Sequence, residues 1–154
     1  MQELSEGKFA TVIDDVDQDD VSKIRRLIIC SGKIYYDLLE RRRQDELDTV
    51  AILRLEQLYP FPHRDFSYLF YQYHNVKDIV WCQEEPQNQG AWYQVQHRLQ
   101  KYLEDDQELH YIGRKASASP AVGYTSLHIE QQYAVVMKAL HGKSELKGLG
   151  KLSE

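Results

Sequence analysis

The adjacent carboxylates Glu84 and Glu85 lie in the stretch with the most obvious chemical potential, WCQEEPQNQGAW at residues 81–92. Two carboxylates can act as a general acid and a general base when both face one substrate. Adjacent residues project in different directions, so this pair is not expected to share a substrate. Because Pro86 restricts the chain beside them, the sequence favours a local role, in which a glutamate pairs with a basic neighbour or accepts hydrogen bonds from a helix start. Catalysis is the less favoured alternative.

Two tryptophans bracket this stretch, and both are interpreted as anchors. Trp81 and Trp92 carry large apolar rings that gain by burial in a core or an interface. Asn88 stands where a helix over the following residues would begin, and asparagine is a favoured helix cap. The sequence therefore predicts a stiff connector between a strand and a helix, with aromatic anchors at its ends.

Other residues with catalytic potential do not form a catalytic pattern. None of the six histidines stands three or four residues from another, so the spacing of a helical metal site is missing and no metal is predicted. A hydrolase would require the motif G-x-S-x-G, which residues 116–123 do not supply, and catalysis by Ser117 or Ser119 is a distant alternative. Cys30 and Cys82 lie in apolar runs and are interpreted as reduced core residues.

Two basic turns could bind an anion. The turn CSGK at residues 30–33, with Ser31 as the expected cap, leads into a helical pattern whose first N–H groups can hold a phosphate. It lacks the motif G-x-x-x-x-G-K-[ST], so an ordinary turn is favoured. Arg114 and Lys115, in GRKASAS at residues 113–119, could hold an anion or the carboxylate of a partner. A free-standing nucleotide-binding α/β module that uses both turns is the alternative function.

Apolar runs with strand character alternate with helical patterns, and these elements must position the residues above. Strands are expected at residues 25–30, 50–55, 76–83 and 108–113, and helices at 33–47, 64–74, 88–104 and 125–140. This alternation is typical of a single layered α/β domain with a mostly parallel sheet and helices on both faces. Ligands tend to bind where the carboxyl ends of parallel strands meet. Lys33, Gln57, Glu84 and Arg114 are expected at this edge.

The charge distribution excludes some classes of partner and suggests domain boundaries. A formal net charge of −5 is unlike that of a general nucleic-acid-binding protein, which needs a basic face. The acidic cluster DDVDQDD at residues 14–20 is interpreted as a solvated part of a connector, residues 1–21, from an upstream domain. No apolar run reaches the roughly 20 residues of a membrane span. The folded domain is expected over residues 22–141, followed by a flexible tail at 142–154.

Four unusual stretches occur in a characteristic order: RRLIICSGKIYYDLLERR, VAILRLEQLYPFP, VWCQEEPQNQGAWY and GRKASASPAVGY. Together they span about residues 22–140 and resemble the C-terminal part of the first component of 2-oxoglutarate dehydrogenase. The resemblance implies the fold of the transketolase C-terminal domain, an α/β unit that supports a dimer and adjoins catalytic domains.

The resemblance also implies a reaction for a longer enzyme. Such an enzyme uses thiamine diphosphate and magnesium to decarboxylate 2-oxoglutarate, and passes the succinyl group to the lipoyl group of a succinyltransferase component. The family's cofactor signature opens on Gly-Asp-Gly, whereas no glycine of this chain is followed by aspartate. The chain is therefore expected to be a structural and dimerisation domain that binds no cofactor and is not catalytic alone. The expected location is the bacterial cytoplasm, or the mitochondrial matrix in a eukaryote.

Some relatives of this kind carry an effector pocket for a nucleotide or an acyl-coenzyme A at the edge of this domain. By position, Gln57 and Arg64 are the candidates here, and His63 is a weaker neighbour. Arginine gives charge-assisted hydrogen bonds to phosphate, and glutamine can bind a base or a ribose. The alternative is a structural arginine at a helix start. A domain separated from its neighbours is also expected to self-associate weakly or to expose an aromatic cluster.

Overall fold

The central sheet has five strands in the order β1-β3-β2-β4-β5 across residues 9–116 and 125–145, the residues that the computed structural model describes. The strands are β1 (Val12–Ile13), β2 (Arg26–Cys30), β3 (Val50–Leu55), β4 (Asp78–Pro86) and β5 (Glu108–Arg114). β2 pairs in parallel with β3 and β4, β4 pairs in parallel with β5, and β1 runs antiparallel to β3. The predicted mostly parallel sheet is confirmed, whereas the sequence pattern does not predict β1.

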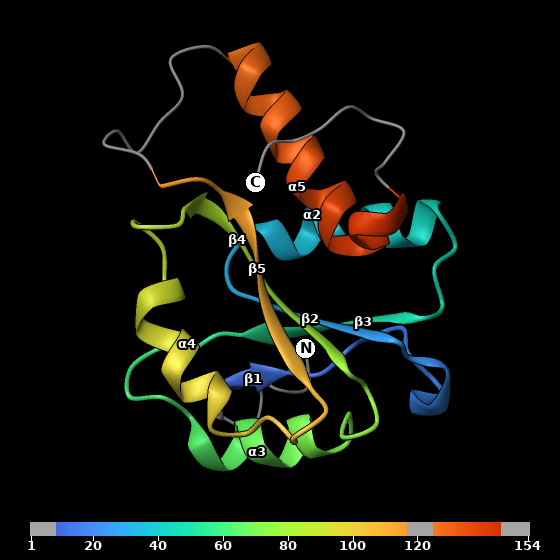
Figure 1. The fold of residues 1–154 in the computed structure, drawn as a ribbon, viewed down its shortest axis with the longest axis vertical. Coiled ribbons are helices and arrows are strands. Elements are labelled where there is room, and N and C mark those ends of the chain that lie inside the picture. Colours follow the sequence, from blue (N-terminus) through green and yellow to red (C-terminus); the bar gives the residue numbers. More distant parts are fainter. Residues whose placement is uncertain (1–8, 117–124, 146–154) are drawn as a thin grey trace.

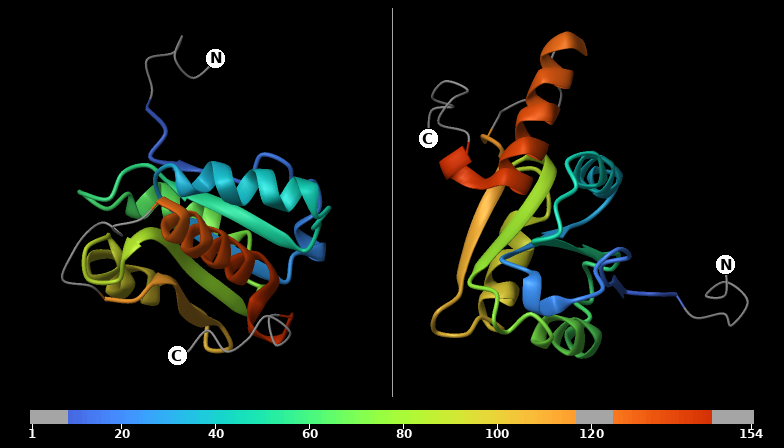
Figure 2. Two further views of the ribbon diagram at one scale, coloured as in Figure 1. Left: turned by 90° about the horizontal axis from the view of Figure 1, so that it is seen from above. Right: turned by 90° about the vertical axis from the view of Figure 1, so that its right-hand side faces the viewer.

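Helices cover both faces of this sheet (Figure 1). They are α2 (Ile34–Gln44), α3 (His63–Tyr71), α4 (Trp92–Gln100) and α5 (Thr125–Glu145). A short 3-10 helix, η1 (Val21–Lys23), precedes β2. α2 and α5 lie on one face and α3 and α4 on the other, most clearly in the right-hand view of Figure 2. The predicted layered α/β architecture is therefore confirmed.

Alternate residues of β2 fill the two halves of the core. Leu27 and Ile29 belong to the apolar cluster beneath α3 and α4, whereas Ile28 and Cys30 belong to the cluster beneath α2 and α5. All four side chains are fully buried, because successive residues of a strand point to opposite faces and this central strand is covered on both. The packed sheet holds the residues at the strand ends in place.

The connector between β4 and α4 differs from its prediction. β4 continues to Pro86, and α4 begins at Trp92 rather than at Asn88. The side chain of Gln83 bonds to the backbone of Pro86 and of Trp92, and thereby holds the intervening chain outside a helix. The expected cap at Asn88 is therefore wrong.

Two further element ends differ from the sequence pattern. The residue at the N-cap position of α2 is Lys33 and not Ser31, since α2 begins at Ile34, one residue after the expected start of the helix. α5 continues to Glu145 across a break at Gly142, whose φ of 75° is readily adopted by glycine. The predicted tail therefore includes residues of this helical segment, and the remainder of that tail lies outside the described residues.

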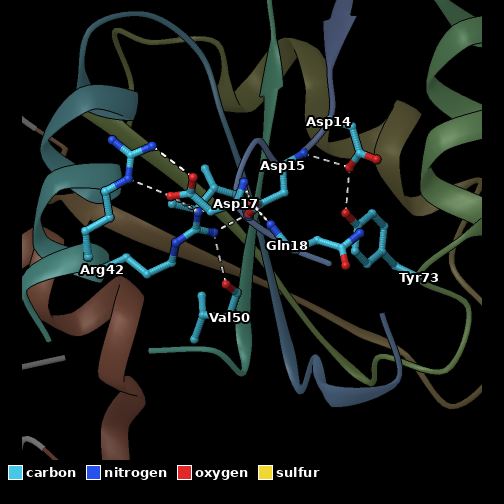
Figure 3. Close-up of polar contacts among 9 residues, drawn as sticks. Asp14, Asp15, Asp17, Gln18, Arg42, Val50 and Tyr73 are labelled. Carbon is cyan, nitrogen blue, oxygen red and sulfur yellow. Dashed lines mark hydrogen bonds and ion pairs between the residues drawn. The ribbon is translucent and has the colours of Figure 1, made fainter. Parts of the chain in front are cut away.

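Asp14 and Asp15 pack on the domain (Figure 3), which corrects the expectation that this end of the acidic segment is solvated. Asp17, Asp19 and Asp20 are exposed, in line with that expectation. The side chain of Asp15 is 1% exposed and accepts hydrogen bonds from Arg42 Nη2 at 3.0 Å and from the backbone N–H of Ile52 at 2.6 Å. Asp14 accepts a hydrogen bond from the Tyr73 hydroxyl at 2.6 Å. These carboxylates are held because they satisfy buried donors that have little access to water.

Candidate functional site

Glu84 lies near the carboxyl end of β4, close to two basic side chains. Its Oε1 atom is 3.6 Å from Lys33 Nζ, at the start of α2, and 4.0 Å from His128 Nε2 on α5. The Glu84 side chain is 18% exposed, so its attraction to these groups is less screened than at an open surface. Glu85 is exposed instead. The two carboxylates thus have different surroundings, which suits a local role better than shared acid–base chemistry.

Arg114, at the end of β5, extends this polar group along α5. Its Nη2 atom donates to Gln132 Oε1 at 3.2 Å and lies 3.5 Å from His128 Nε2. Gln132 in turn donates to Asp37 Oδ2 on α2 at 3.0 Å. These residues form what we call the carboxyl-edge cluster: Lys33, Asp37, Glu84, Arg114, His128 and Gln132. Three of the four side chains expected at this edge therefore come together.

The carboxyl-edge cluster borders a hollow between α2 and α5. The hollow has a volume of about 330 Å³, and its lining includes His128, Gln132, Ile129 and Tyr133. Arg114 Nε is buried and has no hydrogen-bond partner among the described residues. Charged groups of both signs beside apolar side chains suit a complementary protein surface better than a single small anion.

The side chain of Gln83 holds the connector between β4 and α4 by hydrogen bonds, a role that the sequence pattern does not predict. Its Oε1 atom accepts hydrogen bonds from Trp81 Nε1 at 2.9 Å and from the backbone N–H of Trp92 at 3.1 Å. Its Nε2 atom donates to the carbonyls of Glu85 at 3.1 Å and Pro86 at 3.0 Å. The amide thus uses its full bonding capacity while buried. The available signal was a polar residue between a buried strand and a proline.

The three effector candidates lie apart from the carboxyl-edge cluster, at and before the start of α3. Gln57 Nε2 donates to the carbonyl of Pro60 at 2.8 Å, so its amide is engaged within its own loop. His63 Nδ1 contacts the Tyr102 hydroxyl, and Arg64 is exposed. Since α3 and α5 cover opposite faces of the sheet (Figure 2), the structure divides the predicted site residues into two groups.

The cysteines are poorly suited to nucleophilic chemistry. Cys30 and Cys82 are neighbours on β2 and β4, and both are buried free thiols. Burial raises the pKa of the Cys30 thiol to about 12 and also raises the pKa of Cys82 well above its ordinary value. Both thiols therefore stay protonated at neutral pH, and a protonated thiol is a weak nucleophile. Their interpretation as reduced core residues agrees with this placement.

The described part of the chain contains neither a metal-binding group of side chains nor a membrane-spanning helix. Among residues 9–116 and 125–145, no three His, Cys, Asp or Glu side chains are grouped so that they could hold a metal ion. No helix in the described part of the chain is both long enough and apolar enough to cross a membrane. The serines considered as nucleophiles, Ser117 and Ser119, lie outside the described residues.

The mostly parallel sheet with helices on both faces gives this chain an α/β fold of the transketolase C-terminal type. A solved structure described as a split gene transketolase, inactive beta4 tetramer, is similar to this chain with a TM-score of 0.55 and 16% sequence identity. The similarity covers 86% of this chain and 44% of that one. At this level of identity the likeness shows the fold alone.

This chain belongs to the 2-oxoglutarate dehydrogenase C-terminal family, whose model matches residues 1–140. The 2-oxoglutarate dehydrogenase E1 component of Cupriavidus necator is 50% identical over 148 residues, which cover 96% of this chain. The same component of Haemophilus influenzae is 52% identical over 140 residues, which cover 91% of it. The chain spans about 15% of the length of each relative. The family indicated by the four motifs is confirmed.

Proposed function

We propose that this chain is the C-terminal structural and dimerisation domain of a longer 2-oxoglutarate dehydrogenase first component, an oxidoreductase. The observation that carries the proposal is the match of nearly the whole chain to relatives of which it spans about 15%. The longer enzyme decarboxylates 2-oxoglutarate and passes the succinyl group to the lipoyl-bearing succinyltransferase component. Because both relatives come from bacteria, we place this enzyme in the bacterial cytoplasm. The domain alone is not catalytic.

The thiamine diphosphate and magnesium of such an enzyme belong to domains outside this chain. The cofactor signature opens on Gly-Asp-Gly, and no glycine of this chain is followed by aspartate. In the described residues, potential metal ligands are also not grouped in threes. The residues present do not fit this cofactor, so no step of the reaction is assigned to them.

The carboxyl-edge cluster is assigned to contacts with the second subunit of a homodimer. Arg114 has a buried Nε atom without a hydrogen-bond partner among the described residues, and Lys115 beside it is exposed. Ile129 and Tyr133, which line the neighbouring hollow, are 62% and 51% exposed. Apolar side chains next to charged groups of both signs are typical of a surface that another protein covers.

Gln57 and Arg64, with His63 beside them, are assigned to binding of a nucleotide or acyl-coenzyme A effector. Arg64 is exposed, so its guanidinium group can approach a phosphate, whereas Gln57 must first exchange its bond to Pro60. Calorimetry with AMP and acetyl-coenzyme A tests this assignment, and Arg64→Ala should weaken any binding. Submicromolar binding of a flavin or dinucleotide by this chain would favour the free-standing nucleotide-binding module instead.

Reconstitution of activity tests the proposed function. The polypeptide encoded upstream of this chain is prepared separately, and decarboxylation of 2-oxoglutarate is measured with thiamine diphosphate and magnesium present. We expect no turnover by this chain alone and a gain of activity when it is added to the upstream piece, with heat-denatured chain as the control. Turnover by this chain alone, or a gene without upstream coding sequence, would overturn the proposal.

A further inference from the structure

Large aromatic side chains are exposed near the point where the chain enters the domain. The exposed fractions are 74% for Phe9, 84% for Tyr59, 73% for Tyr68 and 67% for Tyr71. Aromatic rings gain by burial and are enriched at protein interfaces. We call these four residues the N-terminal aromatic surface.

Backbone hydrogen bonds of Thr11 place Phe9 beside the loop that carries Tyr59. The carbonyl of Thr11 accepts from the backbone N–H of Glu56 at 2.8 Å and of Gln57 at 3.1 Å. Phe9 precedes Thr11 by two residues, and Tyr59 follows Gln57 by two. The start of the described chain and the loop after β3 are therefore neighbours, although about fifty residues separate them in the sequence.

The side chain of Thr11 extends the same surface to α3. Its hydroxyl donates to Asp65 Oδ2 at 2.6 Å, in the first turn of α3. Tyr68 and Tyr71 follow Asp65 at intervals of three residues, which places them along one side of the helix. Figure 1 shows β1, which directly follows Thr11, next to α3. The backbone segments that carry the four rings therefore lie next to one another.

The opposite side of α3 is firmly packed, so Tyr68 and Tyr71 project from a rigid support. Phe66 and Phe70 are buried in the core, and their rings are stacked with centroids 5.2 Å apart. A surface carried by a rigid helix loses less conformational entropy on binding than one carried by a mobile loop. Its rim carries both signs of charge, since Arg64 and Asp65 are exposed beside it. An apolar centre with a polar rim is the usual anatomy of a protein interface.

We propose that the N-terminal aromatic surface is the docking site for a folded domain of the same polypeptide that precedes this chain. This inference rests on the proposed function, because it requires that longer polypeptide. The chain spans about 15% of its relatives, and the matching family model describes a C-terminal region. A domain joined covalently to the start of this chain is held at high effective concentration beside this surface, so a modest apolar contact is sufficient to fix its orientation.

Binding in trans tests this docking site. The upstream polypeptide is titrated by calorimetry into three versions of this chain: the natural sequence, the double variant Tyr68→Ser with Tyr71→Ser, and the control Tyr93→Ser. Tyr93 is 53% exposed on α4 and lies outside the proposed surface. Since buried aromatic residues often dominate interface energies, we expect the double variant to bind at least about tenfold more weakly and the control to bind like the natural chain. Thermal melts verify that each variant is folded.

The possible outcomes separate this inference from the proposed function. Equal binding by the natural chain and the double variant overturns the docking site, while activity on reconstitution would still support the proposed function. Equal weakening by Tyr93→Ser also overturns it, because the effect would not be specific to this surface. Sedimentation of the chain alone tests a second copy as the occupant. A dimer that the double variant dissociates, with upstream binding unchanged, would show self-association and contradict the inference.

Discussion

Asp15 and Arg42 form a buried ion pair that continues the hydrogen bonding of β3 beyond the end of β1. Asp15 Oδ2 accepts the backbone N–H of Ile52 at 2.6 Å, and Arg42 Nη1 donates to the carbonyl of Val50 at 3.1 Å. The side chain of Asp15 is 1% exposed and that of Arg42 is 4% exposed. Two side chains thus replace a strand at the edge of the sheet, where open backbone groups would otherwise invite pairing with another chain.

Removal of the Asp15 carboxylate should destabilise the domain strongly. Asp15→Ala leaves the buried guanidinium of Arg42 without its main partner, and loss of one member of a buried pair costs about 3–5 kcal/mol. The free energy of unfolding, measured by urea denaturation, should fall by this amount. The matched control is Asp17→Ala, which removes a carboxylate that is 37% exposed, pairs mainly with Arg43 and lies 3.3 Å from Arg42 Nη2. This change should cost less than about 1 kcal/mol, because Arg42 keeps its bonds to Asp15. Equal small effects in both variants would contradict the structural role of the pair.

Gly90 should not tolerate a larger side chain, because of Gln83. A Cβ atom at residue 90 would lie 2.5 Å from Gln83 Nε2 and 2.7 Å from its Oε1 atom. Gly90→Ala should therefore displace the amide and lower the free energy of unfolding by about 1–3 kcal/mol. A double-mutant cycle with Gln83→Ala provides the control, since the cost of Gly90→Ala should shrink once the amide is absent. Strictly additive effects would show that the two residues do not interact.

Asp45, at the end of α2, bonds to His141 of α5. This contact should make the stability of the domain depend on pH in the acid range. The Asp45 carboxylate accepts hydrogen bonds from His141 Nε2 at 2.8 Å and from Arg41 Nε at 3.0 Å, and these bonds, that of His141 foremost, lower the pKa of Asp45. Because the pKa of Asp45 is lower in the folded state than in the unfolded state, its ionised carboxylate stabilises the fold above about pH 4, the ordinary pKa of aspartate. This stabilisation is lost as the pH falls through the pKa that Asp45 has in the folded state.

The free energy of unfolding of Asp45→Asn, measured at several pH values, tests this contact between Asp45 and His141. The variant should be less stable than the natural chain at about pH 6, and the difference should shrink as the pH falls below about 4. Asp48→Asn, at an exposed position four residues from the end of α2, is the control and should follow the natural curve. A constant difference at all pH values would show that ionisation of Asp45 is not the cause.

The two thiols should be unreactive in the folded protein. Burial raises the pKa of Cys30 to about 12 and also raises the pKa of Cys82, so neither forms a thiolate at about pH 8. An aromatic disulfide reagent should label neither cysteine in buffer and both in urea. Rapid labelling of the folded chain would show that the core between the sheet and the helices α2 and α5 opens to solvent, or that a thiol is activated.

The sequence by itself determined the layered fold, the family and the meeting of Lys33, Glu84 and Arg114 at one edge of the sheet. Apolar runs identify buried strands without knowledge of their partners: the run expected at 25–30 is β2, Arg26–Cys30. Once helices connect such strands in parallel, the carboxyl ends must lie together, so residues that follow each strand become neighbours. These properties follow from local patterns and chain connectivity.

Only the tertiary structure decided that Asp15 is buried and that Gln83 holds the connector between β4 and α4. It also decided that Arg64 and Glu84 lie on opposite faces of the sheet. Asp15 and Arg42 are 27 residues apart, and nothing in the spacing of the acidic segment identifies the guanidinium that it satisfies. A polar side chain is held in the interior when distant donors and acceptors complete its hydrogen bonds. That complementarity exists only after the chain has folded, so composition made Asp15 resemble a solvated residue.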